Sequence, residues 1–117
     1  MYSNWEDLEK SIINCKKCKL CTNRNNIVFG QGNKNADIML IGEGPGADED
    51  RLGQPFVGKA GKLMNSAFEG LEIKRDELYI ANIVKCRPPA NRVPEADEAE
   101  ACLDYLRNQV ILVKPKI

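Results

Sequence analysis

Histidine is absent from the 117-residue sequence, and so are a net charge and any long apolar segment. A metal site in this chain would therefore have to use other side chains, of which five cysteines are the best candidates. The longest apolar runs, IMLI and VILV, are far too short to span a bilayer. The first residues, MYSNWEDLEK, do not form a basic region followed by an apolar run, so we expect a cytoplasmic protein without membrane contact.

The composition is typical of one soluble globular domain covering residues 1–117. Hydrophobic residues make up 43% of the chain and charged residues 29%, with 17 basic and 17 acidic side chains. The zero net charge hides a separation, because basic residues gather around the first cysteines and near Cys86, whereas acidic residues follow between Glu95 and Asp104. This separation predicts one basic face.

Apolar runs alternate with amphipathic segments along the chain. Asp37 to Gly42 is a continuous apolar run, as in a strand that is buried on both faces of a parallel sheet. The pattern predicts an α/β fold. The expected helices are residues 5–13, 59–71 and 94–110, and the expected strands are residues 37–42, 78–84 and 110–117. Because the sequence stops inside the last of these strands, we expect a domain that is truncated after the start of its third strand.

The cysteines are the first candidates for chemistry. In a reducing cytosol an odd number of cysteines does not favour disulfides, so metal or cluster ligation is the leading interpretation. Cys15, Cys18 and Cys21 have the spacing of a bacterial ferredoxin motif. That motif needs a fourth cysteine four residues later, where this sequence has Asn25, so a ferredoxin is not predicted.

A four-thiolate site remains. Cys15 and Cys18 form a C-x-x-C pair, and Cys86 and Cys102 would complete the set, with Cys102 on the apolar face of its expected helix. Zinc and an iron–sulfur cluster both accept four thiolates, so the residues alone leave the two open, as well as the alternative of buried free cysteines. Cys21 is expected to be a free thiol outside the set.

A glycine-rich turn, GEGPG, follows the first expected strand directly. Such turns at the carboxyl ends of parallel strands let backbone N–H groups approach a ligand. The glycine spacing does not match the dinucleotide fingerprint G-x-G-x-x-G. Residues 53–59 match G-x-x-x-x-G-K, but Ala60 stands where a P-loop has serine or threonine. A nucleotide-binding domain without a metal is therefore the weaker alternative.

Two further residues are suited to contact a flat, polar ligand. Phe56 lies in a Pro-Phe-Val-Gly bend, where its ring would be free to stack on a base. Asn82 interrupts an apolar strand, and a buried amide without partners is costly, so it must bond either to the neighbouring backbone or to a ligand.

With these residues in view, the sequence resembles the family 4 uracil-DNA glycosylases. The motifs GEGPG, PFVGKAG and ANIVKCRPPANR, framed by the four cysteines, carry the resemblance over nearly the whole chain. It implies a three-layer α/β/α sandwich with a central parallel sheet, and cleavage of the bond between uracil and deoxyribose in DNA. It also implies a four-iron four-sulfur cluster rather than zinc, on Cys15, Cys18, Cys86 and Cys102.

The resemblance assigns roles by position. The base would be bound by Gly42, Glu43, Gly44, Phe56 and Asn82. Either Glu43 or Glu49 would orient the attacking water and so be catalytic. The DNA backbone would be contacted by Lys85, Arg87 and Arg92.

The resemblance also sets limits on activity. Members of the family continue beyond the position of Ile117 to a histidine-containing motif that acts in catalysis, so the expectation is weak excision by this chain alone. The partner is expected to be uracil-containing DNA, and the protein a monomer. The alternative is a non-catalytic iron–sulfur or zinc module that binds DNA or a protein partner.

Overall fold

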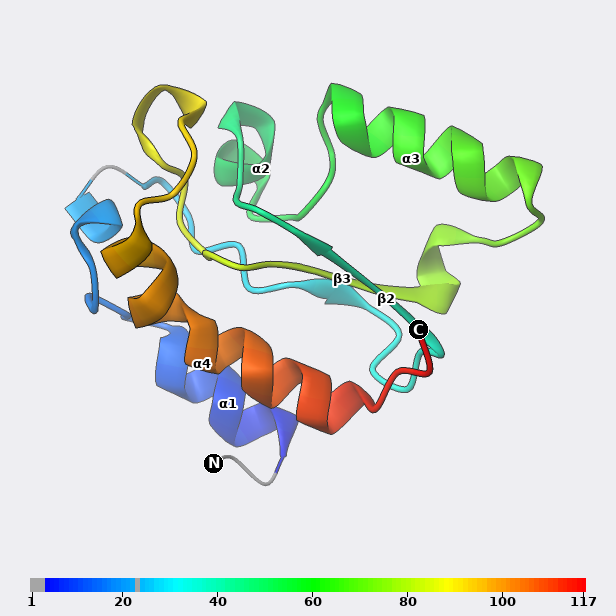
Figure 1. The fold of residues 1–117 in the computed structure, drawn as a ribbon, viewed down its shortest axis with the longest axis horizontal. Helices are drawn as coiled ribbons and strands as arrows, with labels where there is room; N and C mark the ends of the chain where they lie inside the picture. Colours follow the sequence, from blue (N-terminus) through cyan, green and yellow to red (C-terminus); the bar gives the residue numbers. More distant parts are fainter. Residues whose placement is uncertain (1–3, 23) are drawn as a thin grey trace.

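The computed structural model describes residues 4–22 and 24–117 and has an α/β fold (Figure 1). A three-stranded sheet is formed by β1 (Gln31–Gly32), β2 (Ile38–Gly42) and β3 (Leu78–Asn82) in the order β1-β3-β2. The α-helices are α1 (Trp5–Ile12), α2 (Ala47–Leu52), α3 (Lys59–Gly70) and α4 (Ala96–Val113). Short 3-10 helices are η1 (Lys19–Thr22), η2 (Arg75–Glu77) and η3 (Pro89–Asn91).

The two longer strands are parallel, as the sequence predicted, and their carboxyl ends meet because Gly42 pairs with Asn82. Every residue of the central strand β3 is buried. The prediction that residues 37–42 are buried on both faces is wrong, since Ile41 of β2 is 50% exposed. In this sheet β2 is an outer strand with β3 on one side, so it is less covered. The short β1 runs antiparallel to β3 and was not predicted.

The last segment of the chain differs in part from its prediction. Residues 110–113, expected in a strand, form the final turn of α4, which ends at Lys114 in a left-handed conformation (φ 55°). Ile117 then follows β2 with a parallel hydrogen-bond pattern, in which its N–H donates to the Asp37 carbonyl and its carbonyl accepts from Met39 N–H, both at 3.0 Å. Ile117 thus lies beside β2, but residues 110–117 contain no strand, so the strand predicted there is not formed.

The predicted helices are confirmed, and local capping explains where two of them begin. Asn4 caps α1, because its side-chain oxygen accepts from Asp7 N–H at 2.9 Å. At α4, Glu98 turns back and accepts from Glu95 N–H at 2.9 Å. The six-residue α2 was not predicted, because it starts at a glycine inside the turn that the sequence suggested for ligand binding.

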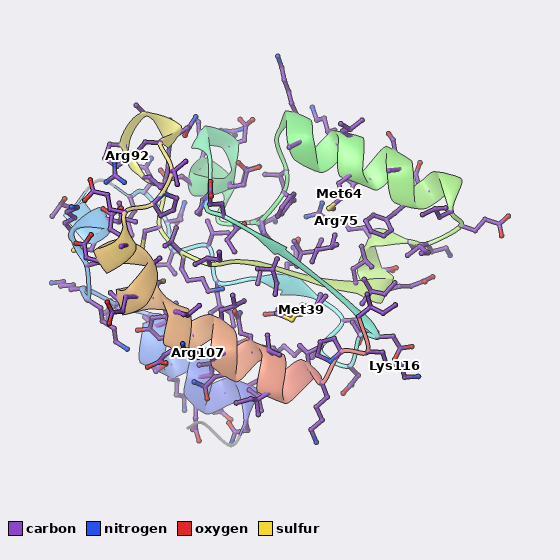
Figure 2. The ribbon with its side chains drawn as sticks, viewed as in Figure 1. Met39, Met64, Arg75, Arg92, Arg107 and Lys116 are labelled. Carbon is purple, nitrogen blue, oxygen red and sulfur yellow. The ribbon has the colours of Figure 1, made fainter. Side chains whose placement is uncertain are left out.

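Helices flank the sheet on two sides. In Figure 1, α1 and α4 lie on one side of the sheet and α2 and α3 on the other. Figure 2 shows Met39 pointing toward α4, whereas Arg75 lies on the side of α3. The core between α1, α4 and the end of β3 is formed by Leu8, Ile12, Leu20, Val84, Cys86, Cys102 and Tyr105. Across the described residues, no helix is both long and apolar enough to cross a bilayer.

Candidate functional site

A hollow opens at the carboxyl ends of β2 and β3, where the sequence placed its candidate base site. It has a volume of about 110 Å³ and is lined by Glu43, Gly44, Glu49, Phe56, Ala60, Gly61 and Asn82. The parallel pairing of β2 with β3 explains the gathering, because it brings the turn after β2 beside the last residue of β3. Segments 40 residues apart in sequence thus form one site.

Gly42 and Asn82 form the floor of this hollow. Asn82 is 2% exposed, and no described residue hydrogen-bonds to its side-chain amide. The amide lines the hollow beside the ring of Phe56. A Cβ atom at Gly42 would lie 2.6 Å from Cζ of Phe56 and closer still to Oδ1 of Asn82. Glycine at this position therefore lets the ring and the amide stand over the end of β2.

The two candidate acids differ in how they are held. Glu49 anchors the turns around the hollow, since its Oε2 accepts from Val57 N–H at 2.8 Å and Gly58 N–H at 2.7 Å, and its Oε1 from Gly46 N–H at 3.0 Å. Burial opposes ionisation of Glu49, but these backbone N–H groups outweigh it and lower the pKa of the carboxyl. Glu43 is exposed, so its carboxylate is open to solvent.

A second hollow of about 90 Å³ adjoins the first on the other side of Glu43 and Gly44. The loop after β3 forms its far wall, with Pro88, Asn91, Arg92 and Pro94. Arg87 starts this loop and donates its Nε–H to Oδ1 of Asn91 at 2.9 Å. Asn91 adopts a left-handed conformation (φ 56°), which turns the loop sharply. Arg87 thus lies beside Pro88 and Asn91, which line the second hollow.

Arg92 is engaged in an ion pair. Its Nη1 and Nη2 donate to the two carboxylate oxygens of Glu98 at 2.7 and 2.8 Å. The Glu98 side chain is fully buried, whereas that of Arg92 is 32% exposed. The hydrogen bonds from Arg92 lower the pKa of Glu98 to about 2, against the effect of burial. The guanidinium of Arg92 thus fixes the loop to the start of α4.

Lys85 does not face solvent, where a DNA phosphate would lie. It is 1% exposed, and its Nζ donates to the Asn82 carbonyl at 2.8 Å and to Oε1 of Gln109 at 2.6 Å. Burial lowers the pKa of its ammonium to about 7. The prediction that Lys85 contacts the DNA backbone is therefore contradicted by its position inside the fold.

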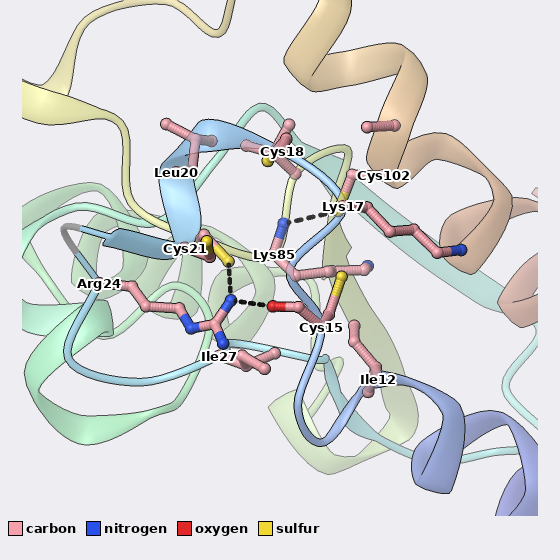
Figure 3. Close-up of a pocket in the computed structure, with 13 residues that line it drawn as sticks. Ile12, Cys15, Lys17, Cys18, Leu20, Cys21, Arg24, Ile27, Lys85 and Cys102 are labelled. Atoms are coloured by element: carbon pink, nitrogen blue, oxygen red, sulfur yellow. Dashed lines mark hydrogen bonds between the residues drawn. The ribbon is translucent and has the colours of Figure 1, made fainter.

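The five cysteines line one narrow cavity of about 10 Å³, which is room for about one water molecule, between η1, the segment after β3 and α4. Figure 3 shows Cys15, Cys18, Cys21 and Cys102 around this space. Cys86 and Cys102 are buried and the other three are half-buried. The four cysteines predicted as ligands are thus brought together from three parts of the chain. Cys21, predicted to lie outside the set, lines the same cavity.

Nitrogen donors surround these sulfurs. Arg24 Nη1 donates to Sγ of Cys86 at 3.3 Å and to the Cys15 carbonyl at 2.6 Å, and Lys85 N–H donates to Sγ of Cys102 at 3.2 Å (Figure 3). Such donors favour thiolates, whereas burial raises the pKa of Cys102 to about 11. A metal group that binds these cysteines as thiolates would therefore displace the protons of their thiols.

The cysteines supply a donor set but no formed metal site. Among residues 4–22 and 24–117, no three Cys, Asp or Glu side chains are placed to hold a metal ion. The thiols do gather around one cavity, and N–H groups donate to two of the sulfurs. In chemistry this donor set fits thiolate ligation, which zinc and iron–sulfur clusters both use.

Two residues that the sequence did not single out connect the parts of the site. Asp50 is 1% exposed, and its carboxylate accepts from the backbone N–H groups of Asn25 and Asn26 at 2.8 and 3.1 Å. It thereby ties the cysteine loop to α2. Arg75 contacts the bend that carries Phe56. Both lie in stretches rich in charge, which give no sign in the sequence of being buried.

Comparison with known proteins agrees with this arrangement. The family model for the uracil DNA glycosylase superfamily matches residues 29–117, which include both hollows and two of the five cysteines. The type-4 uracil-DNA glycosylase of Sulfurisphaera tokodaii is 50% identical over 113 residues, covering 96% of this chain and 51% of that protein.

Other relatives carry the same name. The type-4 uracil-DNA glycosylase of Pyrobaculum aerophilum is 47% identical over 111 residues, or 95% of this chain and 57% of that protein. The type-4 enzyme of Thermotoga maritima is 42% identical over 120 residues, covering all of this chain and 62% of that protein. The chain thus spans about half to three fifths of the length of these curated relatives. The resemblance that the motifs predicted is confirmed, and the chain belongs to the uracil DNA glycosylase superfamily.

Proposed function

We propose that this chain forms the base-recognition part of a DNA glycosylase that hydrolyses the N-glycosidic bond of uracil. The observation that carries the proposal is the side-chain amide of Asn82, which has no hydrogen-bond partner among the described residues and lines one hollow with the ring of Phe56. No described side-chain N or O atom is both fully buried and unpaired, so this amide reaches the space of the hollow, where a ligand can complete its bonds. The type-4 relatives support uracil as that ligand.

Recognition follows from the two side chains. A glycosylase must take its target base out of the helical stack before it can reach the glycosidic bond. In the hollow, Phe56 stacks on the extruded base, and Asn82 donates to a carbonyl oxygen of uracil while it accepts from the adjacent ring N–H. The backbone of Gly42 to Gly44 forms the floor, where its N–H groups approach the base edge.

Hydrolysis places charge on both sides of the bond that breaks. The departing base gains negative charge, which the donors around it stabilise, while the sugar becomes positive. Glu49 has both carboxylate oxygens occupied by backbone N–H groups, whereas Glu43 is exposed beside the same hollow. We therefore assign the water-orienting role to Glu43 and a supporting role to Glu49.

The cofactor in this proposal is a four-iron four-sulfur cluster held by Cys15, Cys18, Cys86 and Cys102, with Cys21 outside the set. When bound, it cross-links the cysteine loop to the segment after β3 and to α4. Reduced thiols favour the cytoplasm as the place of action. We further propose one domain with a three-layer α/β/α sandwich, which the helices on two sides of the sheet support (Figure 1).

DNA would be contacted by the loop after β3. Arg87 is the phosphate contact that fits this role best, because its guanidinium bonds to Asn91, which lines the second hollow, through Nε alone among the described residues. Arg92 contributes mainly by holding the loop to Glu98. We propose that the protein binds uracil-containing DNA as a monomer.

The experiment compares the binding of two single-stranded oligonucleotides that differ only in one uracil or cytosine. Asn82→Ala should weaken uracil-containing DNA by about 5- to 150-fold relative to the cytosine strand, since cytosine reverses the donor and acceptor that the amide reads on uracil and such a contact contributes about 1–3 kcal/mol. The control is Asn35→Ala, which removes an exposed amide before β2. Equal weakening of both oligonucleotides by Asn82→Ala would indicate a module that binds DNA without reading uracil.

A further inference from the structure

The bend that carries Phe56 has an unusual conformation. Phe56 has a φ of 51°, in the left-handed region that residues other than glycine and asparagine rarely adopt. This backbone directs the ring over Gly42, where a Cβ atom would come within 2.6 Å of Cζ. Free of other restraints, the residue would relax to an ordinary conformation and carry the ring away.

Two charged side chains hold this bend from opposite directions. Glu49 accepts from the N–H groups of Val57 and Gly58. Arg75 donates in the other direction, with Nη1 to the Phe56 carbonyl at 2.7 Å and Nη2 to the Pro55 carbonyl. The backbone is therefore fixed on both sides of Phe56.

The position of Arg75 in the fold explains how it reaches the bend. It is the first residue of η2, which leads directly into β3 and so to Asn82. Its Nη1 also donates to Oδ1 of Asn65 on α3 at 3.1 Å, and Figure 2 shows the side chain between the sheet and that helix. Among the described residues no carboxylate pairs with it, so its bonds go to two peptide carbonyls and one amide.

We propose that Arg75 is a positioning residue that holds Phe56 in its base-stacking place. The inference rests on the proposed function, since it names what fixes the stacking ring. The planar guanidinium donates to two successive carbonyls from two nitrogens held in a fixed fork, whereas the ammonium of lysine is a single point on a flexible stem. Arg75 would therefore link the start of β3 to the bend, so that the ring and the amide of Asn82 keep a fixed separation.

The test is a double-mutant cycle on uracil preference, measured as the ratio of dissociation constants for the cytosine and uracil oligonucleotides. Arg75→Ala should reduce the preference by about 10- to 100-fold, the range for losing hydrogen bonds to a charged donor. In a Phe56→Ala background the same change should cost less than about threefold, because Arg75 acts through the ring. An undiminished loss in that background would overturn the proposal.

A conservative variant and a neighbour serve as controls. Arg75→Lys keeps the charge and should fall between the wild type and Arg75→Ala, and it replaces Arg75→Ala in the cycle if that variant does not fold. Lys74→Ala removes an adjacent exposed charge and should leave the preference unchanged. A loss with Lys74→Ala as large as with Arg75→Ala would show a general charge effect and overturn the assignment.

An independent readout separates this inference from the proposed function. If the wild-type chain does not prefer uracil, the proposed function fails, but the position of the ring can still be observed by NMR. A nuclear Overhauser contact between the Phe56 ring and the Gly42 Hα protons should be present in the wild type and lost in Arg75→Ala. Its persistence in Arg75→Ala would show that other contacts hold the ring.

Discussion

Replacing Gly42 by alanine probes the base site at its floor. The added Cβ would lie 2.6 Å from Cζ of Phe56, whereas ordinary contacts begin near 3.4 Å. The ring must therefore shift by about 0.8 Å, and the Asn82 amide, which would be closer still, must move as well. Overpacking of this size costs about 1–3 kcal/mol, which corresponds to a loss of about 5- to 150-fold in uracil preference if the hollow has to adjust.

The assay measures the binding of the uracil and cytosine oligonucleotides together with unfolding by urea. Gly70→Ala is the matched control, since a Cβ there meets no atom within 4 Å and lies at the end of α3. We expect this control to keep its uracil preference and to be as stable as the wild type or up to about 1 kcal/mol more stable. An unchanged preference in Gly42→Ala would refute the view that Gly42 shapes a base pocket.

Three more predictions concern the cysteine cavity, the DNA loop and the buried ion pair. Cys102→Ala should lose the iron and the broad visible absorption of a cluster, as checked by metal analysis of anaerobically purified protein; full iron content would exclude Cys102 as a ligand. Arg87→Ala should weaken both oligonucleotides alike and reduce the salt dependence of binding, and a loss confined to uracil would contradict a phosphate contact. Glu98→Gln should lower the free energy of unfolding by about 2 kcal/mol near neutral pH, below the range for fully buried pairs because Arg92 is 32% exposed. Since folding lowers the pKa of Glu98 from 4.5 to about 2, its contribution is present above pH 4.5 and is lost as the pH falls toward 2; a wild-type advantage that stays constant over that range would contradict the ion pair.

Long segments with a strong pattern could be predicted from the sequence. The apolar run 78–84 marks β3, and the Asn4 cap and the acidic residues at 95–98 mark the starts of α1 and α4. In each case local propensity agrees with burial, so neighbours in sequence suffice for the prediction.

Other features depend on contacts between distant residues and left no local signal. Asp50 lies in an acidic stretch that resembles a solvated surface, yet Asn25 and Asn26 bury its carboxylate. Residues 110–113 are β-branched or leucine and suggested a strand, but burial of Val113 in the core extends α4. Lys85 looked like a surface charge, because its partner Gln109 is 24 residues away.

The sequence predicted which residues lie at the candidate site better than it predicted what each of them does there. The glycine turn, Phe56 and Asn82 do lie around one hollow, because the parallel pairing of β2 and β3 fixes where they meet. The sequence could not separate the two acids, since only the N–H groups around Glu49 reveal that it is structurally occupied. For the same reason Arg75, whose partners are backbone carbonyls, had no recognisable motif.

The most direct test of the central claim is an NMR titration of the wild-type chain with the uracil oligonucleotide. The account predicts saturable shifts of the Asn82 side-chain amide and of the Gly44 backbone amide, which are absent with the cytosine oligonucleotide at the same concentration. Shifts limited to the basic loops around Arg87, equal for both oligonucleotides and without a change at Asn82, would contradict a uracil pocket at the ends of β2 and β3.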